Sequence, residues 1–222
     1  MIELNKIYNQ DCLEGMKLIE DNSIDMTLTD IPYGEVNRPS NGLRNLNKKD
    51  ADIETFKIKN FIQEVSRITK GSVYIFCGIE QVSEVRKELN KNFPSTRHCI
   101  WEKNNPSPIN GQYMWLSAIE NCVYARKKGA TFNEYCVSCV WKSPIEIKQK
   151  HPTQKPIKLF NRLILASTNE KDIVLDCCMG SGTTAHSCIK TNRNFIGFEI
   201  SKEYCDIANQ RIEDELSQTK LF

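Results

Sequence analysis

Short apolar runs alternate with segments of helical periodicity along almost the whole chain. Seven of the runs are rich in β-branched and aromatic side chains, which predicts β-strands. These predicted strands are Leu4–Tyr8, Asp25–Asp30, Ser72–Cys77, Arg97–Glu102, Ile119–Arg126, Asp172–Asp176 and Asn194–Glu199.

Helical periodicity is clearest in four segments. Their apolar positions are Ile58, Phe61, Ile62, Val65 and Ile68, then Val82, Val85 and Leu89, then Phe160, Leu163 and Ile164, and finally Tyr204, Ile207, Ala208 and Ile212. Pro156 suits the first position of the third helix, and Ser201 suits the N-cap of the fourth. Alternating strands and helices predict an α/β fold with an open, mostly parallel sheet and helices on both faces, in which ligands bind at the carboxyl ends of the strands.

Two segments interrupt this alternation. Gly34–Asp50 is polar and has no periodicity, and Asn104–Leu116 combines prolines and a glycine with Tyr113, Met114 and Trp115. Structureless loops of this length inside a domain are uncommon and usually functional. We therefore expect both segments to contribute to substrate recognition.

The composition is that of one ordinary globular domain spanning 1–222. The chain has 222 residues, of which 40% are hydrophobic. No run approaches the roughly 18 apolar residues of a membrane span, and the first residues lack the basic and apolar regions of a signal peptide. We expect a cytoplasmic protein without a membrane partner.

Ten cysteines are present, and most lie in apolar strand-like or helix-like runs. Buried free cysteine behaves as a small hydrophobe, so we expect reduced thiols rather than a disulfide framework. Cys136 and Cys139 form a single CxxC with no second matched pair, whereas zinc normally takes four ligands. We expect no metal site.

The net charge of +2 does not exclude nucleic acid, because such enzymes need only a local basic face. Lysines are concentrated between Arg126 and Arg162. This bias has two interpretations that the sequence leaves open: a solvated lysine-rich surface, or a surface that contacts phosphates.

A glycine-containing loop follows the strand that ends at Asp176. Gly180 and Gly182 permit a close approach of backbone to a ligand and a tight turn into a helix beginning at Thr183. Glu199, at the end of the next strand, can accept hydrogen bonds from ribose hydroxyls. The pattern favours a nucleoside-cofactor site, with a plain strand-to-helix turn as the alternative.

The segment after the strand Asp25–Asp30 combines a carboxylate, a rigid kink and an aromatic ring. Pro32 biases Ile31 to an extended conformation, so the Asp30 carboxylate and the Ile31 carbonyl can point the same way. Two adjacent acceptors match an exocyclic amino group, and Tyr33 can stack on a base removed from a duplex. The alternative is a strand end with a proline turn and a core tyrosine.

These segments, together with His151-Pro152-Thr153-Gln154-Lys155-Pro156, resemble the permuted amino-methyltransferases of bacterial and phage DNA modification. That family has Asp-Pro-Pro-Tyr first, then His-Pro-Thr-Gln-Lys-Pro, then a Gly-Ser-Gly-Thr-Thr loop, and this chain matches in that order. Asn9-Gln10-Asp11-Cys12 is similar to a further cofactor contact of the family. The resemblance spans nearly the whole chain and implies a Rossmann-like, seven-stranded methyltransferase sheet.

The resemblance implies S-adenosylmethionine as cofactor and assigns the site. The implied catalytic residues are Asp30, Ile31, Pro32 and Tyr33. The implied cofactor-binding residues are Asp11, Cys12, Asp30, Thr153, Lys155, Asp176, Cys178, Gly180, Ser181, Gly182, Thr183, Thr184 and Glu199, with Thr153 and Lys155 near the methionine end. Ile31 replaces a usual proline and Cys177-Cys178 a usual Pro-Phe, so Cys178 implies a looser site.

By the same resemblance, the expected reaction is methylation of adenine N6 in a flipped-out base of double-stranded DNA. Asp at the head of the motif favours adenine, while cytosine N4 and an RNA substrate stay open as alternatives. Residues 127–150 form a short candidate target-recognition segment, and a homodimer is a further expected partner. A protein-glutamine methyltransferase, a nicotinamide-dependent oxidoreductase and an inactive DNA-binding module fit the order of motifs less well.

Overall fold

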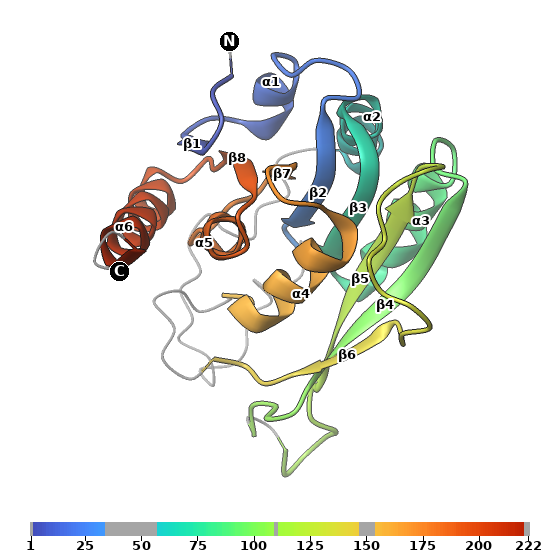
Figure 1. Cartoon of the computed structure of the whole chain (residues 1–222). Coiled ribbons are helices and arrows are strands. Elements are labelled where there is room, and N and C mark those ends of the chain that lie inside the picture. The colour runs from blue at the N-terminus through green and yellow to red at the C-terminus, as the bar shows by residue number, and fades with distance from the viewer. Residues whose placement is uncertain (1, 34–56, 109–110, 147–153, 220–222) are drawn as a thin grey trace.

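The computed structural model describes residues 2–33, 57–108, 111–146 and 154–219. Within these ranges, eight strands form one sheet in the order β1-β8-β7-β2-β3-β5-β4-β6 (Figure 1). The strands are β1 (Lys6–Tyr8), β2 (Ile24–Asp30), β3 (Thr69–Cys77), β4 (Ser95–Lys103), β5 (Ile119–Arg126), β6 (Val140–Ser143), β7 (Ile173–Asp176) and β8 (Asn194–Phe198).

The sheet is mostly parallel, as the sequence predicts. β1, β8, β7, β2 and β3 run in one direction, and β5 lies antiparallel to both β3 and β4. The carboxyl ends of β2, β3, β4, β7 and β8 therefore lie on the same edge of the sheet, where a doubly wound fold binds its ligands.

The expected count of seven strands is wrong by one, because β6 was not predicted. β6 is four residues long and pairs in parallel with β4 at the edge of the sheet. Its side chains alternate, with Trp141 and Ser143 buried and Val140 and Lys142 exposed. A run this short, half polar and containing a lysine, carries too little periodic signal to predict a strand from sequence.

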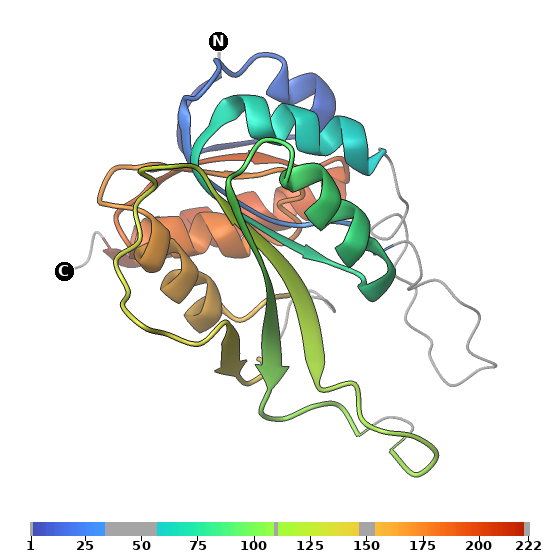
Figure 2. The same ribbon diagram turned by 90° about the vertical axis from the view of Figure 1, so that its right-hand side faces the viewer.

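The helices form one layer on each face of the sheet (Figure 2). One layer contains α1 (Cys12–Met16), α2 (Ile58–Ile68) and α3 (Val82–Leu89), with the 3-10 helix η2 (Ile79–Gln81) leading into α3. The other contains α4 (Ile157–Ser167), α5 (Thr183–Lys190) and α6 (Lys202–Thr219). The predicted helical segments are confirmed, although α4 begins one residue after Pro156, which serves as its N-cap.

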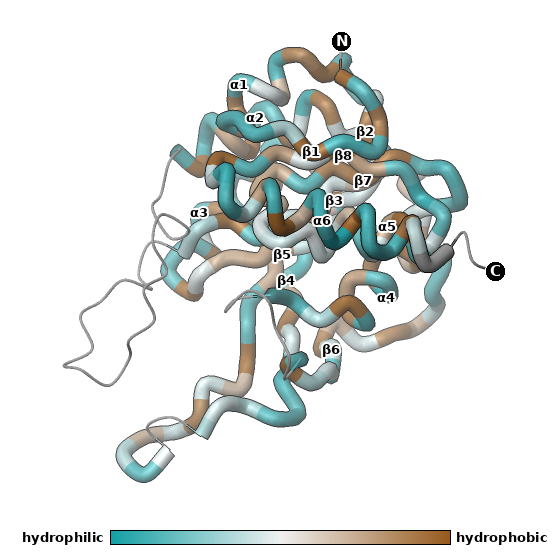
Figure 3. The backbone as a smooth tube through the Cα atoms, turned by 90° about the vertical axis from the view of Figure 1, so that its left-hand side faces the viewer, coloured by the Kyte–Doolittle hydropathy of each residue, from teal (hydrophilic) through white to brown (hydrophobic). Residues whose placement is uncertain are grey.

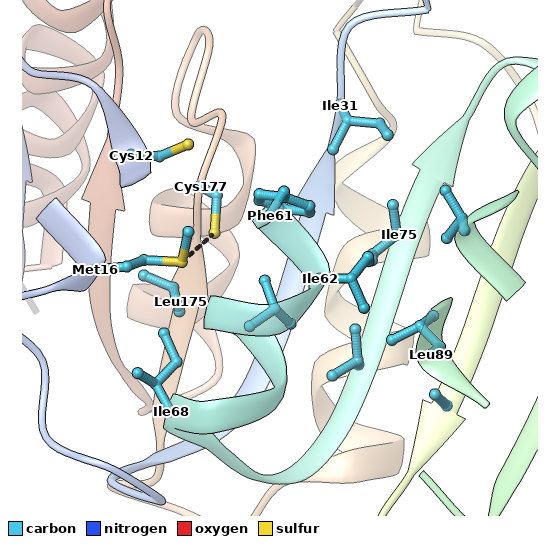
Figure 4. Packing of buried hydrophobic residues seen from close by; sticks show 14 of the residues in the cluster. Cys12, Met16, Ile31, Phe61, Ile62, Ile68, Ile75, Leu89, Leu175 and Cys177 are labelled. Carbon is cyan, nitrogen blue, oxygen red and sulfur yellow. Dashed lines mark hydrogen bonds between the residues drawn. The ribbon is translucent and has the colours of Figure 1, made fainter. Parts of the chain in front are cut away.

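In the α1–α3 layer, the spacing of the apolar residues of α2 brings them all to the face of the helix that packs on the sheet. Phe61, Ile62, Val65 and Ile68 lie on one side of the helix and are completely or almost completely buried against the sheet (Figure 4). In the same core the Cys177 thiol contacts the Met16 sulfur at 3.8 Å, which fixes α1 against the segment that follows β7. Burial of this apolar area is the main stabilising term of the fold.

All ten cysteines are free, and seven are buried. Within the described ranges, no helix combines the length and apolar character needed to cross a bilayer. The connection from β4 to β5, described at 104–108 and 111–118, projects from the carboxyl edge of the sheet away from the body (Figure 3).

Candidate active site

The loop after β7 is shaped by two glycines in the left-handed region. Gly180 has φ 54° and Gly182 has φ 83°. A Cβ at Gly182 would lie 2.9 Å from the Cβ of Ala208 on α6, so this position admits only glycine without strain. A Cβ at Gly180 would meet nothing nearer than the Cys178 carbonyl at 4.0 Å, so the space beside this residue is open to a ligand.

Asp176 ends β7 and is buried within this loop. Its carboxylate accepts hydrogen bonds from the Cys178 amide at 3.1 Å and from the Thr184 hydroxyl at the start of α5. Burial raises the pKa of Asp176 to about 6, although these two donors oppose the shift. The loop therefore holds a carboxylate that titrates close to neutral pH.

Glu199 follows β8 and closes the other side of the loop. Its carboxylate accepts hydrogen bonds from the Gly180 amide at 2.7 Å and the Ser201 amide at 2.8 Å. Burial raises the pKa of Glu199, against the stabilisation that the two amides give to its charge. The Asn9 side chain donates to the backbone carbonyls of Glu199 and Ile200, which ties the segment after β1 to the end of β8.

The other predicted cofactor residues surround the same loop. Asp11 is the N-cap of α1 and accepts hydrogen bonds from the Leu13 amide at 2.8 Å and the Glu14 amide at 3.2 Å. Cys12 is buried in the core cluster against which Cys178 packs, so α1 lies against the loop after β7. Thr183 is buried at the start of α5.

Ser181 has a partner that sequence analysis missed. Arg211 of α6 donates to both the backbone carbonyl and the hydroxyl of Ser181. Arg211 is surrounded in the sequence by polar residues typical of the exposed face of a helix. The sequence therefore gives no indication that its side chain contacts Ser181.

The catalytic motif lies at the end of β2. The Tyr33 hydroxyl donates to Asp30 Oδ1 at 2.8 Å, and the Ile31 side chain is buried in the core. Gln81 of η2 donates from its side-chain amide to the Pro32 carbonyl at 2.9 Å. The turn after β2 is thus held by a contact from the neighbouring connection, which keeps Tyr33 beside Asp30.

Lys155 lies at the centre of a charged cluster with Asp30. Its ammonium donates to Asp30 Oδ2, to Glu120 Oε2 at 3.0 Å and to the Tyr33 hydroxyl at 3.2 Å. On the far side of Glu120, the Lys103 ammonium lies 2.7 Å from Glu120 Oε1. The cluster therefore alternates two carboxylates with two ammonium groups.

The cluster shifts the pKa values of its members in different directions. Burial raises the pKa of Asp30 and outweighs the favourable charge of Lys155. Burial also opposes the charge of Glu120, but Lys155 and Lys103 outweigh it and lower the pKa of Glu120 to about 2. Burial disfavours the Lys155 cation, yet the two carboxylates raise its pKa above the ordinary value, so it stays charged.

The loop after β7 and the cluster at Asp30 lie side by side. β2 and β7 are parallel neighbours in which Met26 pairs with Val174 and Thr27 with Leu175, so the two strands end at the same edge of the sheet, with β2 extending two residues beyond β7. The charge of Asp30 is close enough to raise the pKa of Asp176. A ligand bound in the loop after β7 would therefore lie next to the Asp30 carboxylate.

The structure brings most predicted residues together and adds Arg211, Glu120 and Lys103, which were missed. Lys155 was expected near the methionine end of the cofactor, and in the structure its ammonium donates to Asp30 Oδ2. Thr153 and the segment Gly34–Asp50 lie outside the described residues. Glu120 and Lys103 were not identified, although a Glu within the apolar strand Ile119–Arg126 is a signal that could have drawn attention.

The comparisons with solved structures define the class of the protein first. The crystal structure of the M1.HpyAVI–SAM complex matches with a TM-score of 0.70 and 30% identity, covering 93% of this chain and 98% of that one. PvuII DNA methyltransferase (cytosine-N4-specific) matches with a TM-score of 0.71 at 14% identity, which shows the shared fold alone. The fold is that of the Rossmann-like methyltransferases, as predicted.

Sequence comparisons then give the family. The model of the N6/N4 DNA methylase family matches residues 112–210. Type II methyltransferase M2.DpnII of Streptococcus pneumoniae is 30% identical over 240 residues, covering 94% of this chain and 90% of that protein. Type II methyltransferase M.HinfI of Haemophilus influenzae is also 30% identical, covering 95% and 69%. This chain belongs to the DNA methylase family of type II methyltransferases, and the prediction of a DNA methyltransferase is confirmed.

Proposed function

We propose that this enzyme transfers a methyl group from S-adenosylmethionine to the exocyclic N6 of an adenine flipped out of double-stranded DNA. The proposal rests on one observation: Asp30 at the end of β2 lies next to the glycine-containing loop after β7, the adjacent parallel strand. One carboxylate thereby lies where it can bind an amino group, while others hold a cofactor next to it.

The residues around the loop fit the chemical groups of this cofactor. S-Adenosylmethionine, when bound, supplies a methyl group made electrophilic by a sulfonium. The Glu199 carboxylate suits ribose hydroxyls, and the ionised Asp176 carboxylate suits an ammonium group, since both are acceptors held in place by backbone amides. The open space beside Gly180 allows close approach to the loop backbone. The M1.HpyAVI–SAM complex supports S-adenosylmethionine as the cofactor.

On the substrate side, Asp30 and the Ile31 carbonyl act as paired acceptors. An aromatic amino group is a weak nucleophile because its lone pair is delocalised into the ring. Asp30 and Ile31, by accepting its two hydrogens, localise that lone pair on nitrogen. Asp30 also stabilises the positive charge that develops on this nitrogen, a preorganised electrostatic effect. The nitrogen gains the methyl group and then loses one proton to solvent.

The nature of the base rests on the first residue of the motif. Asp30 heads Asp-Ile-Pro-Tyr, as in the adenine-directed members that the sequence resembles. N4 of cytosine offers the same pair of N–H donors and remains the alternative substrate, as does adenine in RNA. The catalytic motif precedes the cofactor loop in the chain, and this order supports the proposal that the protein is of the permuted class.

Target recognition belongs to two segments on the substrate side. Residues 127–150 carry the predicted recognition segment, and Tyr135 within it is 90% exposed. The β4–β5 connection carries Tyr113, Met114 and Trp115, which are also exposed, and it leaves the sheet beside Lys103 and Glu120 of the charged cluster. Lysines of the recognition segment supply phosphate contacts, and a homodimer remains a further expected assembly.

One assay tests the proposal. The enzyme is incubated with methyl-labelled S-adenosylmethionine and either unmodified duplex DNA or RNA, and the product nucleosides are then separated. We expect label in N6-methyladenine from DNA and little label from RNA. Label in N4-methylcytosine, or preferential labelling of RNA, would replace the proposed substrate by the corresponding alternative.

A further inference from the structure

Both carboxylate oxygens of Asp30 are occupied in the free enzyme. Oδ1 accepts from the Tyr33 hydroxyl at 2.8 Å, and Oδ2 accepts from the Lys155 ammonium. Lys155 retains only 6% of its side-chain exposure, so water cannot readily take its place. An amino group that binds Asp30 must therefore compete with a buried cation for this carboxylate.

We propose that Glu120 makes this displacement possible by retaining Lys155 when the target base takes Asp30. Lys155 and Glu120 are then positioning residues, which keep Asp30 paired in the empty enzyme and release its charge to the substrate. This inference rests on the proposed function and deepens it by describing how the substrate gains access to the acceptor.

The geometry requires little movement for this exchange. The Lys155 ammonium already lies 3.0 Å from Glu120 Oε2, so no new ion pair has to form when its bond to Asp30 is lost. Lys103, at 2.7 Å from Glu120 Oε1, fixes Glu120 from the opposite side and shares its charge. A buried cation without a second carboxylate would instead bind Asp30 as its main partner, because an unpaired buried charge is costly.

The charge of Asp30 depends on groups from every element packed around it. Facing groups come from the turn after β2, from β3, β5 and β7, and from the segment before α4. They are Tyr33, Cys77, Glu120, Cys122, Asp176 and Lys155. Removal of the Glu120 anion lowers the pKa of Asp30, whereas removal of the Lys155 cation raises it. The two changes therefore move the acidic limb of the pH–rate profile in opposite directions.

The test compares three variants with the unmodified enzyme: Glu120→Gln, Lys155→Met and the double variant. For each, the rate of methyl transfer is measured as a function of pH, and base extrusion is measured by 2-aminopurine fluorescence. Glu120→Gln should weaken base capture on the order of tenfold, as expected when a buried ion pair loses one partner, while its acidic limb moves to lower pH. Lys155→Met should move the acidic limb to higher pH. The double variant removes both the competing cation and the carboxylate that retains it, so at a pH above its acidic limb it should capture the base better than Glu120→Gln.

Lys103→Met should change base capture in the opposite direction to Glu120→Gln. Without Lys103, Glu120 holds Lys155 more strongly, so base capture should be at least as strong as in the unmodified enzyme, a result that a folding defect would not produce. Glu88→Gln, which breaks the Glu88–Lys91 pair at the C-terminal end of α3, is the matched control and should have no effect.

Two results would overturn the inference. In one, Glu120→Gln captures the base normally in an enzyme that methylates DNA. In the other, the double variant is no better than Glu120→Gln. Failure of the proposed function is a separate outcome, because the unmodified enzyme would then transfer no methyl group to DNA.

Discussion

At the scale of single residues, similar carboxylates acquire different properties from their neighbours. Glu120 has two lysines beside it, and its pKa falls to about 2. Asp176 has hydroxyl and amide donors but no adjacent cation, and burial raises its pKa to about 6. Two adjacent cations therefore outweigh burial at Glu120, whereas the hydroxyl and amide donors at Asp176 do not.

The pKa of Asp176 predicts how cofactor affinity depends on pH. The ionised form is the one that pairs with an ammonium group, so affinity should be lost as pH falls through about 6. Between pH 7 and pH 5 we expect a loss of about tenfold, the change in the ionised fraction of such a group. Calorimetric titration with S-adenosylmethionine measures it.

Asp176→Asn should bind the cofactor weakly and with little dependence on pH in this range. Asp206→Asn, at an exposed ion pair on α6, is the control and should retain the pH dependence of the unmodified protein. A constant affinity of the unmodified protein from pH 5 to 7 would contradict the assigned role of Asp176.

At the scale of elements, sequence periodicity predicts those parts of the fold whose apolar positions form a clear pattern. Seven of the eight described strands and the helices α2, α3, α4 and α6 were identified from that pattern, and α5 was identified from the glycine loop that precedes it. β6 and α1 were not identified, because β6 has four residues that alternate between buried and exposed and α1 has only five residues. Gly180 and Gly182 could be identified because glycine marks a turn by itself.

The turn from β7 into α5 gives a prediction about stability. Gly182→Ala adds a side chain at φ 83° and places its Cβ 2.9 Å from Ala208 of α6. Left-handed strain and overpacking together should lower the free energy of unfolding by about 2–4 kcal/mol. Chemical denaturation measures this change.

Gly129→Ala is the matched comparison for this prediction. Gly129 has φ 80°, but a Cβ there would meet nothing within 4 Å. It should therefore show the backbone cost alone, about 1 kcal/mol. Equal losses for the two variants would refute the proposed packing of the turn against α6.

At the scale of the whole molecule, the site is assembled from distant parts of the chain. Asp30, Glu120, Lys155 and Asp176 lie on four different segments that meet at one edge of the sheet. Sequence motifs identify Asp30, Lys155 and Asp176 as residues of a site. The ion pair with Glu120 depends on the antiparallel placement of β5 beside β3, which no local pattern encodes.

The central claim is that Asp30 grips the amino group without being needed to hold the cofactor. Single-turnover methyl transfer to duplex DNA, measured with Asp30→Ala alongside calorimetric cofactor binding, tests it most directly. We predict that transfer falls by at least about a hundredfold, the scale of losing a preorganised electrostatic contact, while cofactor affinity stays within a few-fold. An Asp30→Ala enzyme that keeps most of its transfer rate would contradict the account.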